Sequence, residues 1–179
     1  MQLQMPRRLL TAAPLGTTVV VAAGEDRFGS ALRFSDWRFD CKVSAKDTGG
    51  ACCIYDTVRT ASGGPPMHVH YGQDEWFFVR QGEFVFRIGE QAFRLGPGDS
   101  LLGPRGVPHA FTGLSDNGAL TIAFVPAGTI EQLFNEVSEV NRLREPTLED
   151  WSTISRAHDV EIVGPPLKIR SSELAHEMQ

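Results

Sequence analysis

Residues 63–82, which read GGPPMHVHYGQDEWFFVRQG, are the stretch that decides the fold. Its two consecutive prolines exclude a helix, so the residues that follow them are expected to be extended. In a strand, side chains two residues apart point to the same face, so His68 and His70 project together. The turn-forming residues 71–74 then lead into a second apolar strand that opens with Glu75. A hairpin of this kind brings the Glu75 carboxylate back beside the two imidazoles.

A second stretch rich in glycine and proline, residues 98–109, reads GDSLLGPRGVPH. It is expected to turn the chain and to place His109 at the start of another strand. Three imidazoles and one carboxylate form a nitrogen and oxygen donor set suited to a first-row transition metal. We therefore predict one divalent ion per chain. Its identity does not follow from the donor set, which suits iron, manganese, nickel, cobalt, copper or zinc. Asp74 is a rival carboxylate, but it is expected on the opposite face of the strand from Glu75.

Short apolar or alternating runs, separated by turn residues, continue on both sides of these stretches. Such spacing predicts an all-β barrel or sandwich. The expected strands lie near residues 31–43, 51–59, 66–71, 75–80, 83–88, 91–95, 99–103, 109–113 and 119–125. A further strand is expected near Thr17–Ala22, where three valines follow one another.

The pattern changes after Pro126, where apolar residues recur at helical spacing from Ile130 to Leu143. Thr147 followed by Asp150 is a capping box, which predicts a second helix to about residue 157. A last strand is expected at residues 160–163. The predicted organisation is a lead-in strand or arm at 1–30, a barrel at 31–128, and C-terminal helices with a tail at 129–179 in the same domain.

Composition bounds the class of protein. The chain has 179 residues, of which 41% are hydrophobic, as in one globular domain. A net charge of -5 with scattered basic residues argues against a nucleic-acid partner. No apolar stretch approaches the roughly 20 residues of a membrane span. We therefore expect neither nucleic acid nor membrane as a partner.

The N-terminal sequence and the cysteines bear on the compartment. An apolar segment follows Arg7 and Arg8, as in an export signal, but Pro14 and Gly16 interrupt it. The three cysteines, at positions 41, 52 and 53, include no CxxC spacing and form no paired framework. Both observations favour a cytoplasmic protein whose thiols stay reduced.

The two glycine-rich stretches together resemble the two sequence motifs of the cupin superfamily. The matching positions are Gly63, His68, His70, Glu75 and Gly82 in the first motif, and Gly98, Pro104, Gly106 and His109 in the second. Gly63 lies one residue nearer to His68 than is usual, and Gly113 replaces an asparagine that often ends the second motif. The resemblance covers about residues 51–125. It implies a double-stranded β-helix, or jelly-roll barrel, that holds its metal on His68, His70, Glu75 and His109.

The single barrel with a helical tail is similar to the quercetin 2,3-dioxygenase-like cupins. This resemblance implies a metal-dependent dioxygenase acting on a small aromatic or enolisable organic substrate. Glu75 would then serve both as a ligand and as the catalytic base, a role that calls for a raised pKa. Two other classes stay open: a metal-dependent isomerase, decarboxylase or lyase, and a non-catalytic protein that binds or senses a small molecule.

Alternation along the strands also predicts which side chains surround the site. Phe77 shares a face with Glu75, Phe84 and Phe86 share a face of the next strand, and Phe111 shares the face of His109. They are expected to line an apolar pocket for a small molecule, although packing in the barrel core is the alternative interpretation. Exposed outer strands favour a homodimer.

Overall fold

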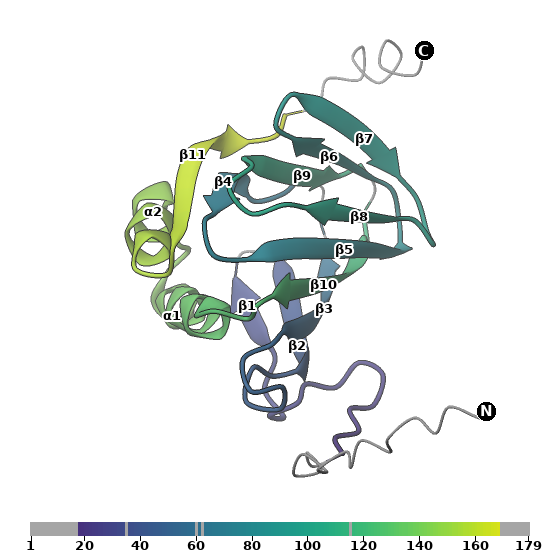
Figure 1. Cartoon of the computed structure of the whole chain (residues 1–179), viewed down its shortest axis with the longest axis vertical. Coiled ribbons are helices and arrows are strands. Elements are labelled where there is room, and N and C mark those ends of the chain that lie inside the picture. The colour runs from purple at the N-terminus through teal and green to yellow at the C-terminus, as the bar shows by residue number, and fades with distance from the viewer. Residues whose placement is uncertain (1–17, 35, 60, 62, 115, 169–179) are drawn as a thin grey trace, which may run out of the picture.

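The computed structural model describes residues 18–34, 36–59, 61, 63–114 and 116–168. Within these ranges the strands form two antiparallel sheets that close into a barrel (Figure 1). The first sheet has the order β1 (Leu32–Phe34), β2 (Trp37–Val43), β3 (Cys53–Arg59), β10 (Ala119–Val125), β5 (Asp74–Gln81) and β8 (Ser100–Gly103). The second has the order β11 (Val160–Pro166), β4 (Pro66–His70), β9 (His109–Gly113), β6 (Phe84–Ile88) and β7 (Gln91–Leu95). The predicted all-β jelly-roll barrel is confirmed.

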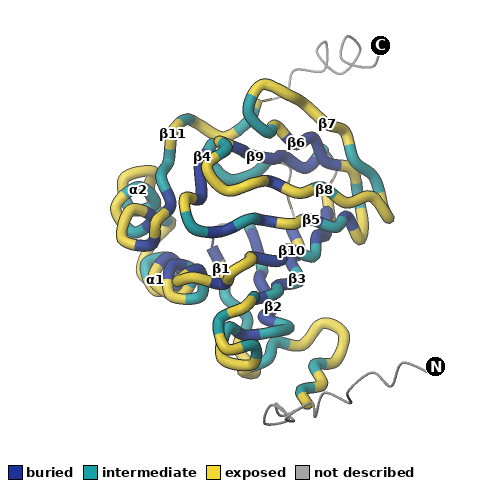
Figure 2. Tube along the Cα trace, in the orientation of Figure 1, coloured by how far each residue is buried: buried dark blue, intermediate teal, exposed yellow. Residues whose placement is uncertain are grey.

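The strands that surround the interior follow the expected alternation. Along β5, Glu75, Phe77 and Val79 are buried, whereas Trp76 is exposed between them. Figure 2 shows β6 and β9 buried along most of their length, while β7 and β8 are mainly exposed. The barrel therefore has a packed interior and outer strands that face solvent.

Two helices follow the barrel strands, as the helical spacing predicts. They are α1 (Ile130–Leu143) and α2 (Leu148–Arg156), and they lie together at one end of the barrel (Figure 1). The capping box that opens α2 is present, because Thr147 accepts from the Asp150 backbone and Asp150 accepts from the Thr147 backbone. From α1, the ring of Phe134 packs 5.1 Å from that of Phe39 and 5.7 Å from that of Phe124. The helices therefore close this end of the interior.

Two of the strand predictions are wrong in detail. Residues 18–22 form no strand, and Val20 is 89% exposed, because this β-branched run has no neighbouring strand to pair with. The single strand expected at 31–43 is a tight hairpin, β1 and β2, in which Phe34 lies opposite Trp37. The last strand runs on to Pro166, which an edge strand such as β11 tolerates.

Two of the three cysteines lie inside the protein. All three cysteines are free, and Cys41 and Cys53 are buried. Burial, with the nearby Glu131 carboxylate adding to it, raises the pKa of Cys41 to about 12. In the described ranges, neither helix combines the length and the apolar character needed to cross a membrane.

Candidate metal centre

Four side chains that the sequence predicts as ligands meet at one point inside the barrel. His68 and His70 come from β4, Glu75 opens β5, and His109 opens β9 directly opposite His68. One donor atom from each residue lies within 4.8 Å of the others, and all four side chains are buried. The turn after β4 and the 103–108 loop before β9 therefore place the residues as their spacing indicates.

Backbone carbonyls orient two of the imidazoles. The Nδ1 of His68 lies 2.8 Å from the carbonyl of Pro66, and the Nδ1 of His109 lies 2.9 Å from the carbonyl of Val107. A carbonyl only accepts, so each Nδ1 carries the proton and donates it. In the neutral ring the lone pair is then on Nε2, the nitrogen that faces the centre. Histidines that bind metals in proteins are commonly oriented by a hydrogen bond of this kind from the other ring nitrogen.

The donor set fits a cation. The Nε2 atoms of His109, His70 and His68 lie 3.0, 3.2 and 3.9 Å from the same oxygen, Oε2 of Glu75. Two of these imidazoles direct lone pairs at a carboxylate that also only accepts, so the groups repel one another unless a positive charge lies between them. Three nitrogens and one oxygen around a buried point are the donors that first-row divalent metals take.

The pKa values follow from the same geometry. Burial raises the pKa of Glu75, but hydrogen bonds with His109, His68 and His70, which these rings donate only when Nε2 is protonated, outweigh it and hold this pKa well below its usual range. Burial lowers the pKa of His68 to about 4. For His109 burial also lowers the pKa, but the hydrogen bond with Glu75, the charge of that carboxylate and the bond with the Val107 backbone together exceed that effect, and the pKa is raised. Taken by themselves, these four groups therefore give Glu75 a lowered pKa, opposite in direction to the one expected of a base.

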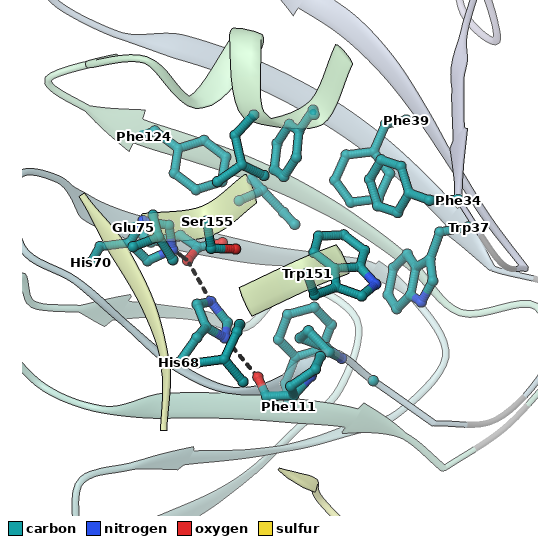
Figure 3. A pocket seen from close by; sticks show the side chains of 18 of the residues that line it. Phe34, Trp37, Phe39, His68, His70, Glu75, Phe111, Phe124, Trp151 and Ser155 are labelled. Carbon is teal, nitrogen blue, oxygen red and sulfur yellow. Dashed lines mark hydrogen bonds and ion pairs between the residues drawn. The ribbon is translucent and has the colours of Figure 1, made fainter. Parts of the chain in front are cut away.

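A cavity of about 300 Å³ leads to the centre, and His68, His70 and Glu75 line it. Seven aromatic side chains line it: Phe34, Trp37, Phe39, Phe111, Phe124, Phe134 and Trp151. All of them except Phe134 are labelled in Figure 3. The polar lining away from the histidines consists of Asp36, Arg59, Glu145 and Ser155. Such a space, apolar with a few polar groups, is typical of a small-molecule site.

The four aromatic residues predicted for the pocket lie in different places. Phe111 lines the cavity, whereas Phe77, Phe84 and Phe86 are fully buried and are not among the residues that line it. The rings of Phe77 and Phe86 pack 4.9 Å apart in the core. Alternation gives the face of a strand on which a side chain lies, but not its depth along the barrel.

Several lining residues had no signal in the sequence. Phe34 and Phe39 reach the cavity from β1 and β2, and Trp151 and Ser155 reach it from α2. Helical periodicity identifies an inward face of α2, but it does not say which cavity that face covers. Asp74, the rival carboxylate, lies outside the centre, where its carboxylate pairs with Arg105 at 2.7 Å.

Comparisons with known proteins agree with this architecture. Residues 57–129 match the family model described as Cupin domain. A predicted oxalate decarboxylase from Thermotoga maritima has a similar structure, with a TM-score of 0.54 and 16% identity over 61% of this chain and 99% of that one. An RmlC-like cupin from Shewanella frigidimarina matches with a TM-score of 0.48 and 18% identity over 55% of this chain and 84% of that one. No curated protein matches the sequence.

The chain therefore has the cupin fold, and its residues 57–129 match the Cupin domain model. Both β4 and the His109 end of β9 fall inside the matched range, as does Glu75. Both helices lie beyond the matched range, since α1 begins at Ile130. At these identities the similar structures bear on the fold and not on the reaction.

Proposed function

We propose that this chain is a metal-dependent dioxygenase that acts on a small aromatic or enolisable organic substrate. The observation that supports the proposal is the meeting of four buried donor atoms, within 4.8 Å of one another, with a cavity that has aromatic walls. A divalent ion held by His68, His70, Glu75 and His109 would act as a Lewis acid and as a template for an oxygen-bearing ring.

The chain itself supplies the surroundings of that reaction. Rings from Trp37, Phe111 and Trp151 present flat apolar surface to a planar substrate and keep water away from it. Glu75 is ionised at neutral pH, so it is able to take a proton from a substrate hydroxyl beside it. Its lowered pKa makes it a weak base, and its role in catalysis is therefore tested separately from its role as a ligand.

The first test is the metal content of the purified protein, measured by elemental mass spectrometry. We expect about one transition-metal ion per chain, as the single donor set implies, and loss of that ion in the His68→Ala/His70→Ala variant. His158→Ala is the matched control, because this histidine pairs with Glu136 at 3.1 Å and takes no part in the donor set. A wild-type protein that takes up no metal even after reconstitution would refute the proposal.

The second test follows oxygen uptake with enolisable aromatic compounds. Glu75→Gln is expected to abolish turnover more completely than it reduces metal content, because the amide is still a donor but no longer takes up a proton. Full activity in this variant would exclude the base role. Turnover without oxygen uptake would support an isomerase, decarboxylase or lyase, and binding without turnover would support a non-catalytic binding protein.

A further inference from the structure

Ser155 of α2 is a polar side chain on the wall of the cavity that the proposed reaction does not use. It is 1% exposed and lines the cavity together with His70 and Glu75. Figure 3 shows it at the end of the cavity where these two residues lie. Its backbone carbonyl accepts from the backbone of His158, but none of the described residues forms a hydrogen bond with its hydroxyl.

A second helical serine shows what a satisfied hydroxyl looks like in this protein. Ser138 of α1 is also buried, at 9% exposed, and its Oγ accepts from the backbone of Arg33 at 3.4 Å. Helical serines otherwise bond the carbonyl four residues earlier, which for Ser155 would be that of Trp151. The Ser155 hydroxyl has no such partner among the described residues, so its partner is expected to be whatever fills the cavity.

The chain after α2 fixes Ser155 close to the metal-binding strand. Val160 of β11 lies opposite His70 of β4, and the Tyr71 backbone donates to the carbonyl of Asp159. Ser155 precedes Val160 by only five residues. The hydroxyl lies beyond residues 57–129, the range that matches the cupin domain. It is therefore a feature of the site that this chain adds to the barrel.

The size of the cavity limits what the hydroxyl meets there. A volume of about 300 Å³ corresponds to about ten water molecules at about 30 Å³ each. One ring, or two fused rings with short substituents, fills such a space. The aromatic walls suit the faces of a planar ligand, so its edge is left to make the polar contacts.

We propose that Ser155 is a ligand-specificity residue, whose hydroxyl bonds a polar substituent of a one- or two-ring aromatic ligand that also presents an oxygen to the metal. This inference rests on the proposed metal site. A site that hydrogen-bonds a polar substituent of its ligand binds analogues without that substituent much more weakly, because the hydroxyl of the site is then left unpaired.

The test measures binding of phenol, catechol, resorcinol and hydroquinone to the zinc-loaded protein by calorimetry without oxygen. In the wild type, the dihydroxybenzene that places its second oxygen at Ser155 is expected to bind more tightly than phenol. Ser155→Ala should weaken the binding of that compound about tenfold, which corresponds to about 1.4 kcal/mol, and leave the affinity for phenol unchanged. Ser155→Thr, which keeps the hydroxyl, should retain the preference, and Ser138→Ala should leave all four affinities as they are.

Thermal unfolding of the ligand-free variants gives a second readout. Ser155→Ala should unfold at the same temperature as the wild type, because no hydrogen bond within the protein is lost, whereas Ser138→Ala should unfold at a lower one. If Ser155→Ala lowered the unfolding temperature as much as Ser138→Ala does, the Ser155 hydroxyl would have a partner within the protein, and the inference would be wrong.

The binding results separate this inference from the proposed function. A wild type that takes up no zinc refutes the metal site itself. A wild type that takes up zinc but binds none of the four compounds, or a preference that is the same with and without the Ser155 hydroxyl, overturns the inference alone. An equal loss for phenol and the dihydroxybenzenes also overturns it, because the hydroxyl would then not be recognising the second oxygen.

Discussion

The two ends of the barrel interior are built from the same strands and differ in what those strands carry. Along β5, Glu75 belongs to the donor set, while Phe77, two residues further on, is fully buried in the core. Along β9, His109 is a donor, and Phe111, two residues further on, both lines the cavity and packs 5.3 Å from the ring of Phe86. One face of one strand thus serves binding at one end and packing at the other, so position along the barrel decides its role.

The contrast arises from what closes each end. At the packed end, rings fill the space so tightly that a Cβ atom at Gly118 would lie 2.6 Å from the Phe84 ring. At the other end, α1 and α2 approach the barrel without filling it, and the cavity remains between Phe134, Trp151 and the strands. The packed end should therefore carry more of the stability, and the helical end more of the ligand recognition.

The largest effect on stability is expected at the packed end. Phe84 is 0% exposed, and Phe84→Ala should lower the free energy of unfolding by about 3–5 kcal/mol. Denaturant unfolding measures this loss, and the metal content should stay at the wild-type level. Phe93→Ala, on the exposed strand β7, is the control and should change little. Loss of metal in Phe84→Ala would show that the two ends are not independent.

Removing a ring from the helical end should matter less for folding. Trp151 is only partly buried and contacts Phe34 edge-on at 5.5 Å. Trp151→Ala is expected to lower the free energy of unfolding by about 1–2 kcal/mol, because a partly exposed side chain contributes less than a fully buried one. The same unfolding measurement checks it, and phenol should bind more weakly to the zinc-loaded variant. A stability loss equal to that of Phe84→Ala would contradict the contrast.

The cap of α2 offers a smaller change at the same end. Thr147→Ala removes the hydroxyl that accepts from the Asp150 backbone at 3.2 Å and should reduce stability by about 1 kcal/mol. The substitution should accelerate amide hydrogen exchange more in α2 than in β6, because the lost hydrogen bond belongs to the first turn of α2. Thr147→Ser keeps the hydroxyl and should restore slow exchange. Equal acceleration in both elements would mean that the helix does not open by itself.

The smallest effect is expected from the exposed ion pair beside the donor set. Hydrogen bonds from Arg105 lower the pKa of Asp74 to about 2. A folded-state pKa below the ordinary value stabilises the protein above about pH 4, and this contribution is lost as the pH falls through about 2. The melting-temperature difference between wild type and Asp74→Asn should therefore be present at pH 6 and shrink toward pH 2. High salt should also reduce it, and a difference independent of both would exclude the ion pair as its cause.

Much of the fold was predictable because it depends on local chemistry. The helix from Ile130 to Leu143 and the capping box of Thr147 and Asp150 follow from spacing alone. Most strands also follow from the sequence, because turn-forming residues mark their two ends. The failures needed information from further away: residues 18–22 lack a partner strand, and the hairpin at Phe34 and Trp37 depends on pairing between its own two arms.

The sequence by itself determined which four side chains share the inner faces of β4, β5 and β9, because alternation and the turns between these strands are short-range properties. Only the tertiary structure decided that Phe77, Phe84 and Phe86 pack while Trp151 and Ser155 line the cavity. A period of two gives a face and a period of 3.6 gives a stripe, but neither gives depth along a barrel or the angle at which a helix docks. Those depend on contacts between residues far apart in the chain.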